Sequence, residues 1–218
     1  MSLWVKICGN TSLADARLAA DAGADAVGFV FAPSPRRITP EQVAAITPHL
    51  PASIEKIGVF VDADFSTIAD AVERAGLTGV QLHSGGPDDL SAQLRGRFGH
   101  GLRILRVIHF GEDAGRQLHT ARADADIDAV LVDSRTATAV GGTGITFDWK
   151  AARASIFSRE SRLKLIAAGG LTPANVAEAI ATLDPWGVDV VSGVESSPGH
   201  KDAAKVRAFV IHARSRER

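Results

Sequence analysis

A cysteine and an aspartate, each at the end of an apolar run, are the residues of this chain best placed for acid–base chemistry. Cys8 ends the run "LWVKIC" and is the only cysteine, and Asp133 ends the run "DAVLVD". A thiol is partly ionised at neutral pH and can remove a proton, while a carboxyl group can donate one. A packing role stays open for Cys8 because free cysteines are usually buried, and a loop-capping role stays open for Asp133.

Glycine-rich segments at 141–144 and 168–170, with the Ser-Gly pair at 192–193, predict an anion site. Glycine adopts positive φ and lets the backbone approach a ligand, so that successive amide N–H groups can converge on a phosphate. Any one segment could be an ordinary turn, but three after consecutive apolar runs favour a phosphorylated small molecule. The candidate residues are Gly142, Thr143, Gly144, Gly169, Gly170, Ser192 and Gly193.

Two further polar positions follow other apolar runs. In "APSPRRI", one of Arg36 and Arg37 can bind a carboxylate through a bidentate fork, and the other is expected to be solvated. His83 could pair with Cys8, although a lone histidine after an apolar run is more often a packing residue.

Eight short apolar runs must position these residues, and they alternate with alanine-rich amphipathic stretches. Helix signals mark the stretches: Ser12 and Thr39 as N-caps, a second Thr-Pro start at 172–173, and a weak helix around 112–122. Nearly continuous apolar runs are typical of parallel strands covered on both faces. The runs are 3–8, 25–31, 55–61, 79–83, 103–108, 128–133, 164–170 and 188–193.

Eight such units predict an α/β fold, a single-domain (β/α)8 TIM barrel over residues 1–218, with a doubly wound open sheet as the alternative. Active sites of these barrels lie at the carboxyl ends of the strands, where the candidate residues fall. Phosphate sites typically use the loops after the last two strands. The glycine segments are expected at this part of the barrel.

The composition is typical of a globular protein, with 45% hydrophobic and 22% charged residues and a formal net charge of −1. A near-zero charge gives no field to attract nucleic acid or an anionic membrane. One cysteine excludes an internal disulfide and multi-cysteine zinc patterns, and no metal site is expected. No apolar stretch is long enough for a membrane helix and no signal peptide is evident, so a cytoplasmic protein is expected.

Seven segments together resemble the phosphoribosylanthranilate isomerase family of tryptophan biosynthesis. The resemblance implies a cofactor-free Amadori rearrangement of a phosphosugar by a monomer or homodimer. It implies Cys8 as the general base at ribose C2′, Asp133 as the general acid at the ring oxygen, and Arg36 as the ligand of the anthranilate carboxylate. It places the glycine segments on the phosphate, and His83 and Asp189 in or beside the pocket. The segments are "VKICGNT", "GADAVGFVFAPSPRRI", "IGVFVD", "VQLH", "VLVDS…GGTGITFDW", "AAGGLTPANV" and "VDVVSGVESSPGHKD".

The sequence departs from the family pattern in three places: Asp62 where Asn is frequent, "QLHSGG" for "QLHG", and Ser134 where Thr is common. The histidine-pathway isomerase is an alternative with the same chemistry, but that family resembles this chain less because it has an aspartate base where Cys8 stands. A catalytically silent phosphosugar-binding barrel is a second alternative. The presence of both Cys8 and Asp133 argues against it.

Overall fold

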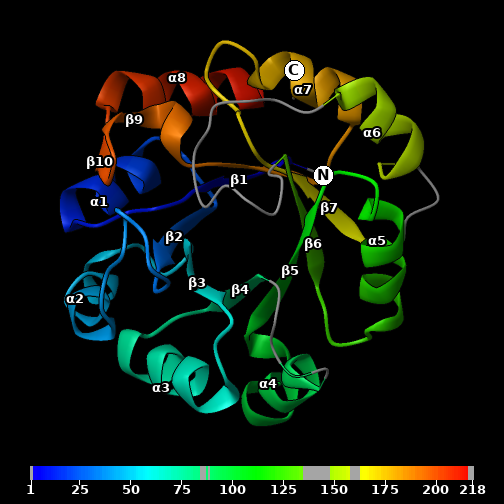
Figure 1. Ribbon diagram of the computed structural model, residues 1–218. Coiled ribbons are helices and arrows are strands. Elements are labelled where there is room, and N and C mark those ends of the chain that lie inside the picture. The colour runs from blue at the N-terminus through cyan, green and yellow to red at the C-terminus, as the bar shows by residue number, and fades with distance from the viewer. Residues whose placement is uncertain (1, 84–86, 88, 135–147, 158–162, 216–218) are drawn as a thin grey trace.

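Eight parallel strands close into a barrel in chain order, β1 pairing with both β2 and β8 (Figure 1). The computed structural model describes residues 2–83, 87, 89–134, 148–157 and 163–215. The predicted (β/α)8 barrel is confirmed, and the open-sheet alternative is wrong because the first and last strands pair. The strands are β1 Trp4–Ile7, β2 Ala26–Val30, β3 Glu55–Val61, β4 Gly79–His83, β5 Arg103–His109, β6 Ala129–Asp133, β7 Lys164–Ala167 and β8 Gly187–Val190.

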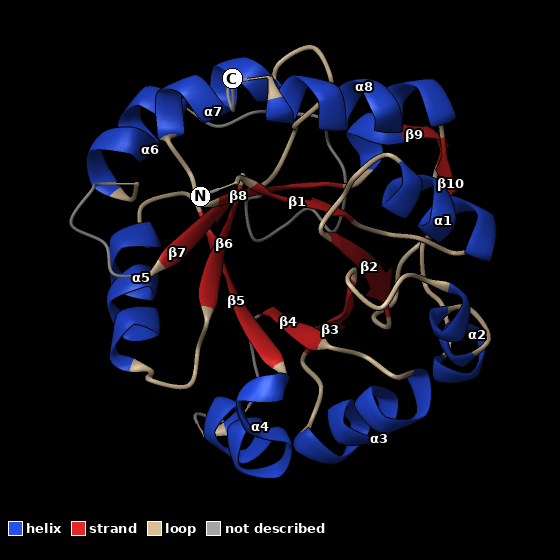
Figure 2. Ribbon diagram, turned by 180° about the vertical axis from the view of Figure 1, so that it is seen from behind, coloured by secondary structure: helices blue, strands red, loops and turns tan. Residues whose placement is uncertain are grey.

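Helices surround the barrel on the outside (Figure 2). After β8 the chain forms the short 3₁₀ helix η3 (Ser192–Val194) and an antiparallel hairpin of β9 (Glu195–Ser197) and β10 (His200–Lys201), which lies beside α1 and α8. None of the helices in the described part of the chain is long and apolar enough to cross a membrane. The main helices are α1 Leu13–Asp21, α2 Pro40–Ala44, α3 Phe65–Ala75, α4 Leu90–Phe98, α5 Ala114–Ala123, α6 Trp149–Ser155, α7 Val176–Leu183 and α8 Ala203–Arg214.

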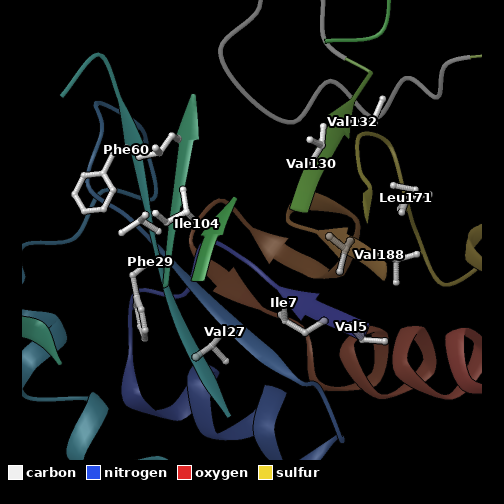
Figure 3. Close-up of a cluster of buried hydrophobic side chains, with 14 of the residues drawn as sticks. Val5, Ile7, Val27, Phe29, Phe60, Ile104, Val130, Val132, Leu171 and Val188 are labelled. Atoms are coloured by element: carbon white, nitrogen blue, oxygen red, sulfur yellow. The ribbon is translucent and has the colours of Figure 1, made fainter. Parts of the chain in front are cut away.

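Alternation along each strand divides the apolar side chains into two clusters, because successive residues point to opposite faces. The larger cluster lies between strands and helices (Figure 3), and Val5, Ile7, Val130 and Val132 belong to it. The smaller cluster fills the barrel interior. Its members are Trp4, Ala26, Ile57, Leu105, Val107, Ala129, Leu131, Ile166 and Ala168. Both faces are buried, which explains the nearly continuous apolar runs.

Local capping signals are confirmed at α1 and α2. The Ser12 side chain accepts the N–H of Asp15, and Thr39 forms a capping box with Gln42. The second Thr-Pro start was wrong as a helix boundary, since α7 begins later, at Val176.

The Asn175 side chain explains this later start of α7. It accepts the N–H of Thr172 and donates to the carbonyl of Gly170, which holds the preceding residues in a turn.

Candidate active site

Polar side chains occupy the carboxyl half of the barrel interior, above the apolar cluster. On β1, Val5 and Ile7 pack outward, so Lys6 and Cys8 point inward by alternation. The same rule places Asp133 inward on β6, two residues beyond Leu131 of the interior cluster. Two strands far apart in sequence thus bring the thiol and the carboxyl group to the same end of the barrel.

Lys6 lies at the centre of this polar layer and is fully buried. Its Nζ donates to Oε1 of Gln81 on β4 and to Oδ1 of Asp189 on β8, both at 2.8 Å. Burial alone would lower the pKa of Lys6, but the charges of Asp189 and Cys8 outweigh it and hold the pKa above its usual value. The amine is therefore an ammonium group at neutral pH.

Cys8 is buried directly above this lysine, and Gly28 of β2 makes the room for it. A Cβ atom on Gly28 would lie 2.4 Å from Sγ of Cys8 and 3.0 Å from Cε of Lys6, which no side chain at that position could tolerate. Burial raises the pKa of the Cys8 thiol above its ordinary value, while the neighbouring Lys6 opposes that rise. The backbone of Cys8 is fixed as well, since its carbonyl accepts a 2.6 Å hydrogen bond from Nζ of Lys201.

Asp133 is buried at the end of β6 and contacts the turn after β7 closely. Oδ1 of Asp133 lies 2.6 Å from the position that a Cβ atom on Gly169 would occupy, and Oγ of Ser134 lies 2.1 Å from it. Gly169 also has φ near 80°, a conformation that glycine adopts without strain. The glycine at this turn is therefore required for the carboxyl group to take its place.

Arg36 and Lys201 meet at the carboxylate of Glu195, beside the barrel mouth. Arg36 forms a bidentate pair with Glu195, with Nε to Oε1 at 2.9 Å and Nη2 to Oε2 at 2.7 Å. Nζ of Lys201 donates to Oε1 at 3.1 Å. Burial would raise the pKa of Glu195, but the two cations hold that pKa below its usual value. Nη1 of Arg36 donates to none of the described residues, whereas Arg37 is exposed as predicted.

A pocket of about 470 Å³ lies between the turn after β7 and η3. Ser192 and Gly193 of η3 line it, and a Cβ atom on Gly193 would lie 1.9 Å from the carbonyl oxygen of Leu171. The other lining residues are Gly170, Leu171, Thr172, Pro173, Ala174 and Lys205. The structure thus brings Gly170, Ser192 and Gly193 together. Gly142, Thr143 and Gly144 lie outside the described residues.

The remaining candidates occupy the same end of the barrel. Asp189 binds Lys6, and a ring nitrogen of His83 lies 3.1 Å from Nε2 of Gln81. The ring of His83 is 6.3 Å from that of His109 between centroids. Within the described ranges, no three His, Cys, Asp or Glu side chains are grouped to hold a metal ion.

The sequence analysis missed most of the charged and polar side chains that surround the candidates. Lys6 could have been found from alternation alone, because it stands two residues before Cys8 in the same run. Gln81 follows from the same argument, two residues before His83. Glu195, Lys201 and Lys205 carried no such signal, since they belong to a hairpin and helix whose placement depends on tertiary structure.

The fold and the polar carboxyl end of its interior define the chain as a (β/α)8-barrel enzyme. The sequence model of the family described as N-(5'-phosphoribosyl)anthranilate (PRA) isomerase matches residues 5–212. The chain therefore belongs to the N-(5'-phosphoribosyl)anthranilate isomerase family, the isomerases of tryptophan biosynthesis.

Individual relatives agree with this assignment over nearly the whole chain. N-(5'-phosphoribosyl)anthranilate isomerase of Geobacter sulfurreducens is 44% identical over 212 residues, which cover 96% of this chain and 98% of the relative. The solved phosphoribosyl anthranilate isomerase of Thermotoga maritima has a TM-score of 0.83 at 35% identity, covering 98% of this chain and 99% of that one. A second solved structure, an isomerase in complex with reduced 1-(o-carboxyphenylamino)-1-deoxyribulose 5-phosphate, has a TM-score of 0.81 at 34% identity, covering 98% and 99%.

Proposed function

We propose that this chain converts N-(5'-phosphoribosyl)anthranilate to 1-(2-carboxyphenylamino)-1-deoxyribulose 5-phosphate, with Cys8 as general base and Asp133 as general acid. The similar isomerase solved with a reduced form of that product supports the choice of substrate. The observation that carries the roles is the pair of inward, buried titratable groups at the carboxyl ends of β1 and β6.

The reaction follows as two proton transfers by these side chains and a final tautomerisation of the enaminol. The carboxyl group of Asp133 gives its proton to the ring oxygen, the bond from C1′ to that oxygen breaks, and the anthranilate nitrogen becomes the cationic nitrogen of a Schiff base. That cation acidifies the proton on C2′, and the thiolate of Cys8 takes it to leave a neutral enaminol. The enaminol gains a proton at C1′ and loses one from its 2′-oxygen, which gives the ketose.

The two ends of the substrate would be held outside this reacting centre. Arg36 is proposed to bind the anthranilate carboxylate through Nη1, the nitrogen that Glu195 does not engage. The phosphate is proposed to occupy the pocket of Gly170, Ser192 and Gly193, where backbone N–H groups and the exposed Lys205 favour an anion. Binding energy from these remote groups orients the sugar between Cys8 and Asp133.

The test of the base is Cys8→Ser, assayed by the loss of the fluorescent anthranilate substrate. A serine hydroxyl is not ionised at neutral pH, so we expect turnover to fall by about 10²- to 10⁴-fold with an unchanged thermal unfolding midpoint. The matched control is Asp62→Asn, which changes an exposed residue at the end of β3 and should keep wild-type turnover. Near wild-type turnover in Cys8→Ser would show that another group takes the C2′ proton.

Assembly, domain extent and alternative substrates stay predictions. One solved structure describes the Thermotoga maritima enzyme as dimeric, and for this chain a monomer or a homodimer is proposed. We propose that residues 1–218 form one catalytic domain. Assaying the histidine-pathway substrate beside the anthranilate substrate distinguishes the two isomerase reactions on the purified protein.

A further inference from the structure

We propose that Lys6 is a positioning residue for the reaction: its buried ammonium group, held by Gln81 and Asp189, stabilises the thiolate form of Cys8. The inference rests on the proposed function for its catalytic meaning. The contact between the two side chains can be tested without it.

The position of Lys6 is fixed from two sides of the barrel. Its Nζ donates one hydrogen bond to Gln81 on β4 and one to Asp189 on β8, each at 2.8 Å. An ammonium group has three N–H donors, so one remains after these two bonds. Lys6 is fully buried, so its third N–H donor is shielded from bulk water. Its partner has to be a polar group of the barrel interior.

Gly28 shows that the thiol of Cys8 is the neighbour of that remaining donor. Sγ of Cys8 and Cε of Lys6 both lie close to the position that a Cβ atom on Gly28 would occupy, at 2.4 and 3.0 Å from it. The two side chains therefore meet over this glycine, with Nζ one bond beyond Cε. The two side chains are close enough for the ammonium charge of Lys6 to favour the thiolate of Cys8, and the pKa of each depends on the other.

Charged groups from four elements face the thiol, and Lys6 is the cation with the largest effect on it. Lys6 on β1 favours the thiolate more than Lys201 on β10 does, and Asp189 on β8 disfavours it. Arg36, from the segment between β2 and α2, also interacts with the Cys8 charge. Lys201 and Arg36 pair with Glu195 and Lys6 pairs with Asp189, but only Lys6 of these three cations lies on the same face of the same strand as Cys8.

A direct titration of the thiol tests this arrangement. The chain has one cysteine and no tyrosine, so the ultraviolet absorbance of the thiolate can be followed with pH without tyrosinate absorbance. The Cys8→Ser protein supplies the baseline. We expect Lys6→Met to move the midpoint of the thiol titration upward by about one unit or more, which is a ~10-fold smaller thiolate fraction at neutral pH. The acid limb of the kcat/KM–pH profile should move by the same amount.

Two further variants keep the test decisive. Lys6→Met leaves the Asp189 carboxylate buried without its cation, so the double variant Lys6→Met with Asp189→Asn gives a neutral layer that should fold if the single variant does not. Its midpoint should also lie above wild type, but by less than that of Lys6→Met, because Asp189 no longer opposes the thiolate. Lys56→Met removes a lysine whose Nζ binds the carbonyl of Pro51, and it should leave the midpoint unchanged.

The outcomes separate this proposal from the proposed function. An unchanged thiol midpoint in a folded Lys6→Met or double variant overturns the role of Lys6, whatever the turnover of Cys8→Ser. A raised midpoint together with an active Cys8→Ser protein supports the Lys6–Cys8 pair and removes Cys8 as the base.

Discussion

The two ends of the barrel use the same charged residue types in opposite ways. At the carboxyl end, the Lys6–Asp189 pair has side chains only 0% and 6% exposed, and Arg36–Glu195 is similarly buried. At the amino end, the Arg103–Glu55 pair is 25% and 24% exposed. Partly solvated pairs contribute little energy each, whereas the desolvation of a buried pair costs much of what its attraction returns.

The difference in exposure separates charged residues that position the candidate site from charged residues that stabilise the fold. The amino-end pair of Arg103 and Glu55 links β5 to β3 across β4, and Arg103 also lies over the ring of Trp186 at 5.5 Å. The carboxyl-end charges instead surround Cys8 and Arg36 with fixed partners. We therefore expect substitutions at the carboxyl end to change catalysis most, and those at the amino end to change stability slightly.

The largest expected effect comes from Asp133→Asn. An amide cannot give a proton to the ring oxygen, so we expect steady-state turnover to fall by about 10²- to 10⁴-fold with the unfolding midpoint nearly unchanged. The matched control is Asp128→Asn, the same chemical change just before β6, where Asp128 accepts hydrogen bonds from Arg95 and the N–H of Ile104. Equal losses of turnover in both variants would break the distinction between the two ends.

A smaller effect is expected from Glu195→Gln. The neutral amide no longer holds the Arg36 guanidinium through a charged bidentate pair, so we expect KM to rise roughly tenfold with a smaller change in kcat. Steady-state kinetics on Glu195→Gln, Arg36→Gln and the double variant measure this coupling. Additive increases in KM would mean that Glu195 acts independently of Arg36.

The smallest effect is expected from Arg103→Met at the amino end. Removing one partner of a partly exposed pair should lower the free energy of unfolding by at most about 1 kcal/mol and leave kcat/KM unchanged. Denaturant unfolding followed by an activity assay measures both quantities. A clear loss of kcat/KM in this variant would show that the amino end also positions the site.

Much of the fold could be predicted from local patterns. All eight apolar runs became barrel strands, because a parallel strand buried on both faces leaves a continuous apolar signal. The caps at Ser12 and Thr39 depend on residues within three positions and were also correct. The start of α7 was wrong because the side chain of Asn175 binds the turn before it, a choice that the Thr-Pro pair does not reveal.

The sequence by itself determined the strand order of chemistry-bearing residues: Cys8 at the end of the first run, Asp133 at the end of the sixth, and glycine segments at or just after the ends of the last three. Their roles in the reaction remain predictions. Alternation points Lys6 and Gln81 inward, but only the tertiary structure decided which charges meet there, since Lys6, Asp189, Glu195 and Lys201 come from four different elements. Hydrophobic periodicity is a local property of the chain, whereas the electrostatic environment of a buried thiol depends on groups that only barrel closure brings within a few ångströms.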